Sequence, residues 1–557
     1  MRTSYVWQPG NLIAILLCLP SLGCGTSAPA PQSEMEPAPR SARAMPTQIL
    51  SEMPPASDGT WTVPSSEAYD HETESSPLAV RDQPLSTFSI DTDTASYSNI
   101  RRYLQQHQLP PADAVRIEEC LNYFNYNHPS PDGETPFATH AEVASCPWNP
   151  QHRLAMIGIQ GRRMANHQRP ASNLVFLLDV SGSMNHPKKL PLVQESMRLL
   201  VDQLGETDHL AIVVYAGAAG VVLPSTSATR KPEIRRAIDR LRPQGSTNGA
   251  LGIRLAYDIA LENFIKDGVN RVILCTDGDF NVGITNRNEL TDLITTKAKS
   301  GVFLSVLGFG MGNLKDATME SLADRGNGNY AYIDGPAEAR KVLVDQMTGT
   351  LVTIAKDVKI QVEFNPQQVA GYRLIGYDNR RLANRDFHDD TKDAGEIGAG
   401  HCVTAFYEIV PAGQALVTHR STTEALKYQH TATQDIEFTT PPNSEIVTSR
   451  FHDELFTIKL RYKQPASDVS QKLEIAVSDR GTSFGQATGD FRFASAVALF
   501  GMMLKNSPYR GGATWNLVQE LSEGARDSDP TGQRSEFIDL VRRAQSLQSE
   551  RRVGIVD

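Results

Sequence analysis

The stretch from Asn173 to Met184, "NLVFLLDVSGSM", decides the fold. Its apolar run has no polar interruption, which is typical of a strand that is buried on both faces of a sheet. The run ends at Asp179, and Ser181 and Ser183 follow at alternate positions. A helix is predicted to begin near Leu190. In an open α/β sheet, ligands bind outside the carboxyl ends of the strands, so we expect these oxygen-bearing side chains to line a crevice.

Strand and helix patterns alternate from residue 172 to residue 351. Nearly continuous apolar segments predict strands at "LVFLLDV", "HLAIVVYA", "RVILCTD" and "VFLSVLGFG", and "NYAYI" closes the series. Amphipathic segments predict helices over residues 190–204, 232–241, 250–264, 287–299, 316–323 and 337–347. Strands that alternate with helices build a sheet that is covered on both faces. The sequence therefore predicts a doubly wound α/β domain with a mostly parallel, Rossmann-like sheet.

The N-terminus has the features of an export signal. Arg2 is followed by an apolar run that is too short to span a bilayer. The end of this run, "SLGC", resembles the bacterial lipobox, which implies that residues 1–24 are a lipoprotein-type signal peptide with a lipidated Cys24. Ser21 stands where the lipobox usually has Leu, so plain secretion or a short uncleaved anchor is the alternative. Residues 25–84 are rich in Pro, Ser and Ala and predict a disordered tether.

Folded segments are predicted on both sides of the central domain. Residues 85–171 form an N-terminal flanking domain, in which we expect a strand over 86–90 and helices over 96–106 and 113–123. In residues 352–557, alternating segments such as "VKIQVEFN", "HCVTAFYEIVP" and "LFTIKLRYK" predict antiparallel strands. "DFRFASAVALFGMMLKNS" and "EFIDLVRRAQSL" predict amphipathic helices that pack on those strands. The sequence thus predicts an N-terminal helical segment and a C-terminal β-rich plus helical domain.

Charge and cysteine content exclude several classes of partner. The 557 residues carry a formal net charge of -10 and show no cluster of Lys and Arg, which argues against nucleic-acid binding. Beyond the signal region no cysteine pair has CxxC spacing, so zinc and redox motifs lack support. Whether Cys120 and Cys146 form a disulfide stays open at this stage, and so does the oligomeric state.

Two more loops carry oxygen ligands toward the same edge of the predicted sheet. Thr247 lies in "PQGSTNGALG", and Asp277 follows the strand in "VILCTDGDFNVG". With Asp179, Ser181 and Ser183 they make a set of two carboxylates and three hydroxyls. Hard oxygen ligands of this kind suit Mg²⁺, or Mn²⁺ or Ca²⁺, better than zinc. The sequence predicts that these five side chains form one metal site.

The three loops also resemble a known site. "DVSGS", "GSTN" and "CTDG", in that order, resemble the metal-ion-dependent adhesion site of von Willebrand factor type A domains. The resemblance implies that Ser181, Ser183 and Thr247 lie in or near direct contact with the ion, while Asp179 and Asp277 bind it directly or through water. It also implies that an Asp or Glu of a protein partner completes the coordination. The expected function is metal-dependent protein binding, in adhesion or as a scaffold, and not catalysis.

The resemblance extends to nearly everything after the tether. "TFSIDTDTASYSNIRRYL" and "LPPADAVRIEE" precede the central domain, and "ELFTIKLRYKQP" and "FASAVALFGMMLKNSPYRG" follow it. These segments resemble a family of bacterial envelope von Willebrand A proteins, many of which are lipoproteins. The family implies a lipoprotein of the bacterial cell envelope that is anchored in the membrane through its lipid and faces the periplasm, with secretion as the alternative.

Other motifs are weaker. "TDGDFNVG" imitates a calcium loop through Asp277, Asp279 and Asn281, but Val282 stands where that loop needs Gly and Asn288 where it needs Glu. We therefore reject the calcium-loop interpretation.

Enzymatic interpretations start from two places. "GTSFG" fits an esterase elbow with Ser483 as the nucleophile, yet "SDRG" separates it from the preceding strand, so a turn is favoured. In "SIDTDTAS", Asp91 and Asp93 are interpreted as turn and N-cap residues. A hydrolase that uses the oxygen cluster and a structural domain with a vestigial site remain the alternatives to metal-dependent binding.

Overall fold

The central part of the chain is a six-stranded sheet. The computed structural model describes residues 66–245, 249–278, 287–415, 451, 453–526 and 529–553. Cys24 and Thr247 lie outside these residues, as do the signal peptide and most of the predicted tether. In their order across the sheet, the strands are β10 (Tyr330–Ile333), β9 (Phe303–Phe309), β8 (Val269–Thr276), β5 (Ser172–Asp179), β6 (His209–Tyr215) and β7 (Ala219–Ser227).

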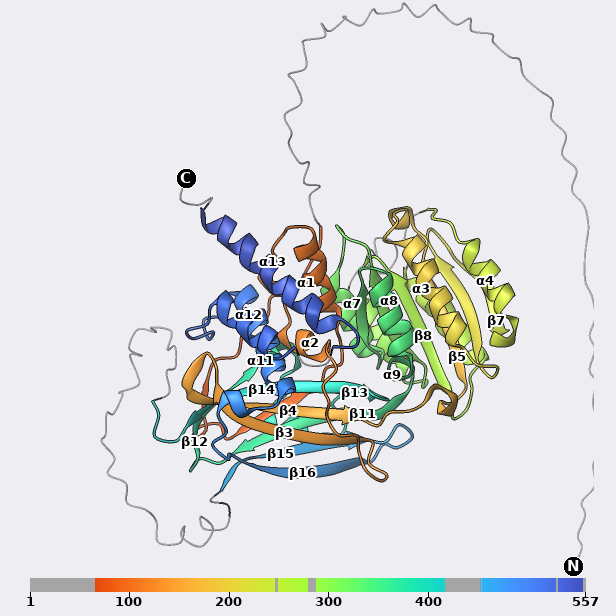
Figure 1. The fold of residues 1–557 in the computed structure, drawn as a ribbon. Helices are drawn as coiled ribbons and strands as arrows, with labels where there is room; N and C mark the ends of the chain where they lie inside the picture. Colours follow the sequence, from red (N-terminus) through yellow and green to blue (C-terminus); the bar gives the residue numbers. More distant parts are fainter. Residues whose placement is uncertain are drawn as a thin grey trace, which may run out of the picture. The chain divides into compact units, whose positions relative to one another are not determined.

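Five of these strands run parallel, and only β7 at the edge is antiparallel. The predicted doubly wound, mostly parallel α/β fold is confirmed (Figure 1). Strand β7 was not predicted, because its apolar residues are interrupted by Gly, Pro and Ser. The single helix expected over 337–347 is divided into α8 (Pro336–Arg340), a π-helical turn (Lys341–Asp345) and α9 (Met347–Leu351).

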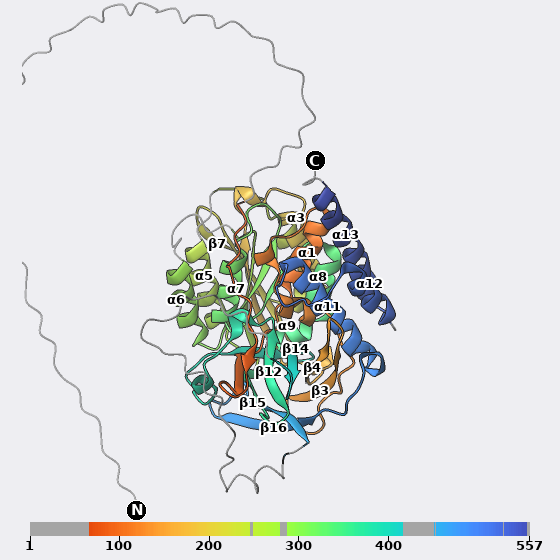
Figure 2. The same ribbon diagram turned by 90° about the vertical axis from the view of Figure 1, so that its left-hand side faces the viewer.

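Helices cover both faces of this sheet, as Figure 2 shows. Alternate residues of β5 point to opposite faces, so Phe176 and Leu178 join one apolar core and Val175 and Leu177 join the other. The first face is covered by α3 (Leu190–Gln203), α4 (Lys231–Asp239) and α8. The second is covered by α5 (Gly249–Glu262), α6 (Arg287–Ala298) and α7 (Asp316–Arg325). This double burial is why the β5 segment is apolar without interruption.

The flanking segments form two further sheets together. One contains, in order, β1 (Leu78–Ala79), β12 (Val369–Ile375), β14 (Cys402–Pro411), β4 (Asn149–Gly161) and β3 (Phe137–Cys146). The other contains β13 (Gly395–Gly398), β11 (Thr353–Phe364), β15 (Glu454–Lys463) and β16 (Ser470–Ser478), with β2 (Leu85–Ser89) also paired to β11. Each sheet therefore combines strands from before and after the central domain.

This interleaving corrects two expectations. The division into separate flanking domains at 85–171 and 352–557 does not hold, because β2 pairs with β11 and β4 pairs with β14 along their lengths. The N-terminal flank is also not only helical: besides its helices α1 (Ala95–Gln105), of 11 residues, and α2 (Ile117–Asn122), of 6, it contains β3 and β4, of 10 and 13 residues. The predicted antiparallel strands of the C-terminal part are confirmed.

The helices of the two flanks share one apolar core. Helix α11 (Gly489–Lys505) contributes Phe491 and Phe493, and its Thr488 N-cap accepts a hydrogen bond from the amide of Phe491 at 3.1 Å. Phe491 contacts Phe406 of β14, with ring centroids 5.7 Å apart, so the helix packs on the strands as expected. Helices α12 (Trp515–Gly524) and α13 (Gln533–Val553) complete this layer. Within the described residues, no helix is both long and apolar enough to cross a membrane.

The structure also shows where the predicted tether ends and whether Cys120 and Cys146 form a disulfide. Residues 66–84 belong to the folded body: Leu78 pairs with Tyr372, and Val80 is only 1% exposed. The composition of this segment concealed its structure, because backbone pairing and ion pairs hold it more than apolar burial does. Cys120 and Cys146 are both buried free thiols and form no disulfide.

Candidate metal centre

Two carboxylates meet at the carboxyl ends of neighbouring strands. Strand β5 ends at Asp179, and Asp277 directly follows β8. The two strands are parallel and paired in register from Ser172 to Leu178, so both ends lie at the same edge of the sheet. Asp179 and Asp277 are fully buried, each 0% exposed. The sheet topology therefore brings together two acids that are about a hundred residues apart in sequence.

The loop after β5 folds around the Asp179 carboxylate. The amide of Ser181 donates to Asp179 Oδ1 at 2.8 Å, and the Thr276 hydroxyl donates to Oδ2 at 3.3 Å. The hydroxyls of Ser181 and Ser183 are 2.9 Å apart. Ser181 is buried while Ser183 is exposed, so the pair leads from the buried acid to the surface. The alternate spacing that the sequence shows places both hydroxyls on one side of a tight loop.

The loop that precedes Thr247 is held against this arrangement. The amide of Gly182 donates to the carbonyl of Gly245 at 3.0 Å, and the amide of Gln244 donates to the carbonyl of Val180 at 2.6 Å. Gly245 has a φ of +77°, a conformation that favours glycine. Thr247 itself lies outside the described residues, so its place in the predicted metal site stays a prediction.

The charge of one acid affects the protonation of the other. Burial, followed by the charge of Asp277, raises the pKa of the Asp179 carboxyl to about 7, although hydrogen bonds from Ser181 and Thr276 oppose the shift. Two like charges in a low-dielectric setting cost free energy unless a positive charge compensates them. The side chains around Asp179 offer oxygen atoms, from Thr276, Ser181 and Ser183, and such ligands fit a hard divalent cation such as Mg²⁺.

Lys189 is a member of this centre that the sequence analysis missed. Its ammonium lies 2.8 Å from Asp277 Oδ2 and donates to Asn313 Oδ1 at 3.0 Å. The side chain is 9% exposed. A Lys just before a helix is unremarkable in sequence, and only the fold reveals that it reaches the end of β8. Lys189 compensates part of the charge of Asp277 and fixes that carboxylate in place.

The remaining sequence candidates have structural partners. Asp93 donates its amide to Asp91 Oδ1 at 3.0 Å, which is the expected turn, and Asp93 Oδ1 also accepts from the amide of Tyr330 at 2.7 Å. The Ser483 hydroxyl donates to Gln486 Oε1 at 2.9 Å within a turn on the surface. Asp279, in the rejected calcium loop, lies outside the described residues.

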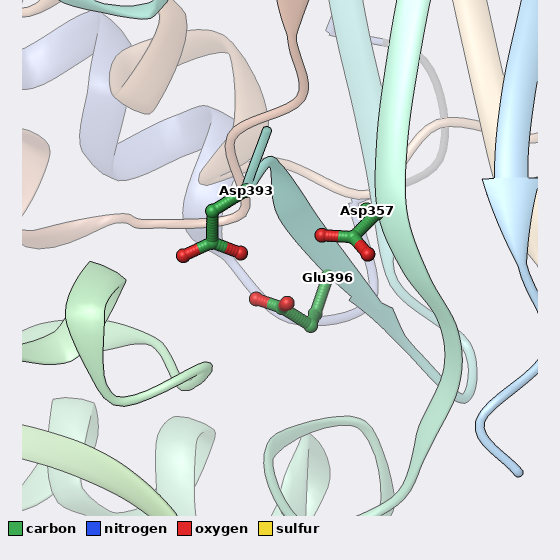
Figure 3. Close-up of side chains that lie close together, drawn as sticks. All are labelled: Asp357, Asp393 and Glu396. Atoms are coloured by element: carbon green, nitrogen blue, oxygen red, sulfur yellow. The ribbon is translucent and has the colours of Figure 1, made fainter. Parts of the chain in front are cut away.

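A second acidic group lies in the flanking sheets. Asp357, Asp393 and Glu396 bring their carboxylates within 4.8 Å of one another (Figure 3). Burial and then the charge of Asp357 raise the pKa of Asp393 to about 6, and burial and then Asp393 raise that of Glu396. Lys463 lies 2.7 Å from Asp357 and compensates one of the charges. Asp357 belongs to β11, Glu396 to β13 and Asp393 to the segment just before β13, so no local motif predicted the three acids.

Comparison with known proteins places the chain. A family model described as the C-terminal part of the uncharacterized protein YfbK matches residues 349–547, and the von Willebrand factor type A domain model matches residues 173–346. A further model, von Willebrand factor, matches residues 63–156. The uncharacterized protein YfbK of Escherichia coli (strain K12) is 41% identical over 491 residues, which cover 87% of this chain and 82% of that protein. The chain belongs to the YfbK family.

The family assignment confirms the resemblance to bacterial von Willebrand A proteins. The YfbK-type chain also shares 25% identity over 277 residues with human inter-alpha-trypsin inhibitor heavy chain H3, covering 48% of this chain and 28% of that one. Among solved structures, the von Willebrand factor type A protein from Catenulispora acidiphila aligns with a TM-score of 0.41 and 14% identity, covering 72% of this chain and 89% of that one.

Proposed function

We propose that this YfbK-family protein binds a protein partner through a divalent cation, and that it is not an enzyme. In this proposal Asp179, Ser181, Ser183 and Asp277 hold the ion together with Thr247. The ion is Mg²⁺, or Mn²⁺ or Ca²⁺. Its positive charge would attract an Asp or Glu of the partner.

One observation carries the proposal. Two fully buried carboxylates, Asp179 and Asp277, lie at the same edge of the sheet and affect each other's charge, and the paired hydroxyls of Ser181 and Ser183 lead from Asp179 to the surface. Buried acids that served stability alone would each be expected to have a cationic partner. Lys189 supplies one positive charge for the two acids. A divalent cation reachable through Ser183 would compensate the charge that the two acids share.

Binding is favoured over hydrolysis by the roles of the same acids. Metal-assisted hydrolysis needs a positioned general base in addition to the ion. In the proposed centre both carboxylates serve the ion, and Asp277 is also tied to Lys189. A hydrolase would show substrate turnover that Asp179→Ala abolishes, whereas a binding protein captures its partner in a fixed ratio.

The decisive experiment combines metal titration and partner capture. In thermal unfolding, an ion bound only by the folded state at one hundred times its Kd adds about 2.7 kcal/mol of stability. We expect Mg²⁺ to raise the Tm of the wild-type protein, and EDTA or Ser181→Ala/Ser183→Ala to abolish the rise. Ser300→Ala, an exposed serine on another loop, is the matched control. If Mg²⁺, Mn²⁺ and Ca²⁺ all leave the Tm unchanged, the site is vestigial and the proposal is wrong.

Capture of the partner should depend on the metal and on the two serines in the same way. In pull-downs from envelope extract, the same protein should be lost with EDTA and with the Ser181→Ala/Ser183→Ala variant, but kept with Ser300→Ala. Capture that persists in EDTA would contradict a metal-bridged contact.

We also propose that the protein is a lipoprotein of the bacterial cell envelope, attached to the membrane through Cys24 and facing the periplasm. The lipobox-like "SLGC" supports this attachment. Cys24→Ser should move the protein from the membrane fraction to the soluble fraction and abolish labelling with a radioactive fatty acid. Unchanged fractionation of the variant would instead favour secretion or an uncleaved anchor.

A further inference from the structure

The first described residues lie along a loop of the central domain. We call residues Ser66–Ala68 the strap. The amide of Ser66 donates to the carbonyl of Gly312 at 2.8 Å, and the amide of Ala68 donates to the carbonyl of Leu314 at 3.0 Å. Ala68 and Lys315 form a parallel bridge. The strap is thus an added strand on the loop between β9 and α7, residues 310–315, which we call the β9–α7 loop.

Glu67 fastens the strap to two parts of the molecule at once. Its side chain is 4% exposed and accepts two hydrogen bonds of 2.8 Å from the Arg102 guanidinium of α1. It also accepts from the amide of Gly312 at 2.7 Å and from the Tyr103 hydroxyl at 2.7 Å. Although burial works to raise it, Arg102 and these other donors hold the pKa of Glu67 at about 2. One buried carboxylate therefore joins the strap, α1 and the β9–α7 loop.

The same loop forms one wall of the candidate metal centre. Asn313 accepts the hydrogen bond from Lys189, whose ammonium lies against Asp277. Two glycines allow this close approach. A Cβ on Gly278, beside Asp277, would lie 2.6 Å from the amide nitrogen of Lys315, and a Cβ on Gly310 would lie 2.4 Å from the Lys189 side chain. The β9–α7 loop therefore packs closely against both Lys189 and the chain beside Asp277.

We infer that the strap controls the metal centre: docked on the β9–α7 loop, it holds Asn313 and the positioning residue Lys189 in place, and its release lowers the affinity for the cation. This inference rests on the proposed function, because it concerns the regulation of the same centre. The physical basis is preorganisation, since a loop that is ordered before binding loses less conformational entropy when the ion binds. Any pull on the chain before Ser66 acts first on the strap.

Glu67→Gln in the full-length protein is the test variant, and Asp70→Asn is its matched control. Both remove one negative charge from the same segment, but Asp70 is 54% exposed and pairs with Arg287. Calorimetric titration with Mg²⁺ should show at least about a fivefold loss of affinity in Glu67→Gln, the lower end of typical coupling between sites. Asp70→Asn should stay within about twofold of the wild type.

Linkage gives a second readout that needs no variant. If the strap strengthens Mg²⁺ binding, Mg²⁺ must strengthen strap docking by the same factor. Hydrogen exchange at the amides of Ser66 and Ala68 should therefore slow at least about fivefold when the wild-type protein is saturated with Mg²⁺. This measurement decides the question even if Glu67→Gln does not fold.

Two results would overturn the inference, and they are distinguishable. If the wild type binds Mg²⁺ but neither Glu67→Gln nor the exchange experiment shows coupling, the strap is only structural while the proposed function stands. If the wild type binds no Mg²⁺, the proposed function fails and the inference fails with it.

Discussion

Replacement of Arg101 by Met should cost far more stability than loss of an ion pair on the surface. Arg101, on α1, lies 2.6 Å from Asp334 and 2.7 Å from Glu338, which belong to the central domain, and 3.1 Å from Glu536 on α13. The exposed fractions are 6% for Arg101, 9% for Asp334 and 1% for Glu338. The guanidinium therefore joins three segments of the chain where little water reaches it.

The size of the expected loss of stability follows from the carboxylates that remain buried once the guanidinium is removed. Removing one partner of a buried ion pair costs about 3–5 kcal/mol, because the other charge remains buried without compensation. Glu536 is 37% exposed, so its ion pair with Arg101 contributes at most about 1 kcal/mol to the free energy of unfolding. Glu338 keeps the nearby positive charge of Lys341, which together with Arg101 holds its pKa below the usual value against the effect of burial. We therefore expect Arg101→Met to lose about 3 kcal/mol, the lower end of the range.

Urea unfolding at pH 7 provides the assay, with Arg198→Met as control. Arg198 pairs with Asp239 at 2.6 Å, but the two side chains are 42% and 54% exposed, so the control should lose at most about 1 kcal/mol. The double variant Arg101→Met/Glu338→Gln should recover stability relative to Arg101→Met alone, since it removes one stranded charge. If Arg101→Met and Arg198→Met shift the midpoint equally, burial does not give the Arg101 network its strength and our reasoning is refuted.

Three other substitutions test the electrostatics and the packing. Burial, and then the charge of Arg271, lowers the pKa of His401 to about 4. Between pH 6.5 and 4 the unfolded chain therefore holds a proton that the folded protein lacks, and the free energy of unfolding falls on acidification by up to about 3 kcal/mol. His401→Gln should reduce this fall in a series of urea midpoints measured across the same pH range. Glu396→Gln should be more stable than the wild type at pH 8 and lose that advantage by pH 4.5, because the raised pKa of Glu396 costs stability only above the pKa of the unfolded state; an equal advantage at both values would contradict this. Gly328→Ala should lose about 1–3 kcal/mol, because its Cβ would lie 1.9 Å from the carbonyl oxygen of Leu304, whereas Gly512→Ala, where the Cβ meets nothing within 4 Å, should be neutral in the same thermal unfolding assay.

Local patterns predicted the elements whose burial is uniform. The uninterrupted apolar run before Asp179 predicted β5, and the position of Asp277 after a similar run placed both acids at one sheet edge. Strand β3 was missed because its alternation carries His and Glu on a half-buried face. The strap was missed because a single carboxylate, Glu67, fastens it and its composition is that of a linker. A hydropathy pattern indicates how far a segment is buried, whereas β3 and the strap depend on contacts with particular residues elsewhere in the chain.

Some residues of the candidate site could be predicted from the sequence and others could not. Asp179, Ser181 and Ser183 are close in sequence, so their spacing already implied a shared loop. Lys189 reaches the centre through a long side chain whose direction depends on the packing of α3, and Asn313 joins it from a loop more than a hundred residues away. The register between β11 and β2 likewise depends on strands that are distant in sequence, so the common sheets of the two flanks could not be predicted.

The combination of early and late strands within the two flanking sheets has a consequence for synthesis on the ribosome. Strand β4 emerges long before its neighbour β14, and β2 long before β11, so neither sheet can close until the strands that follow the central domain have been made. The central sheet draws all of its strands from one continuous stretch and can form while translation continues. During that interval the apolar faces of β2, β3 and β4 await their partners, which is the period when a nascent chain of this kind most needs a chaperone.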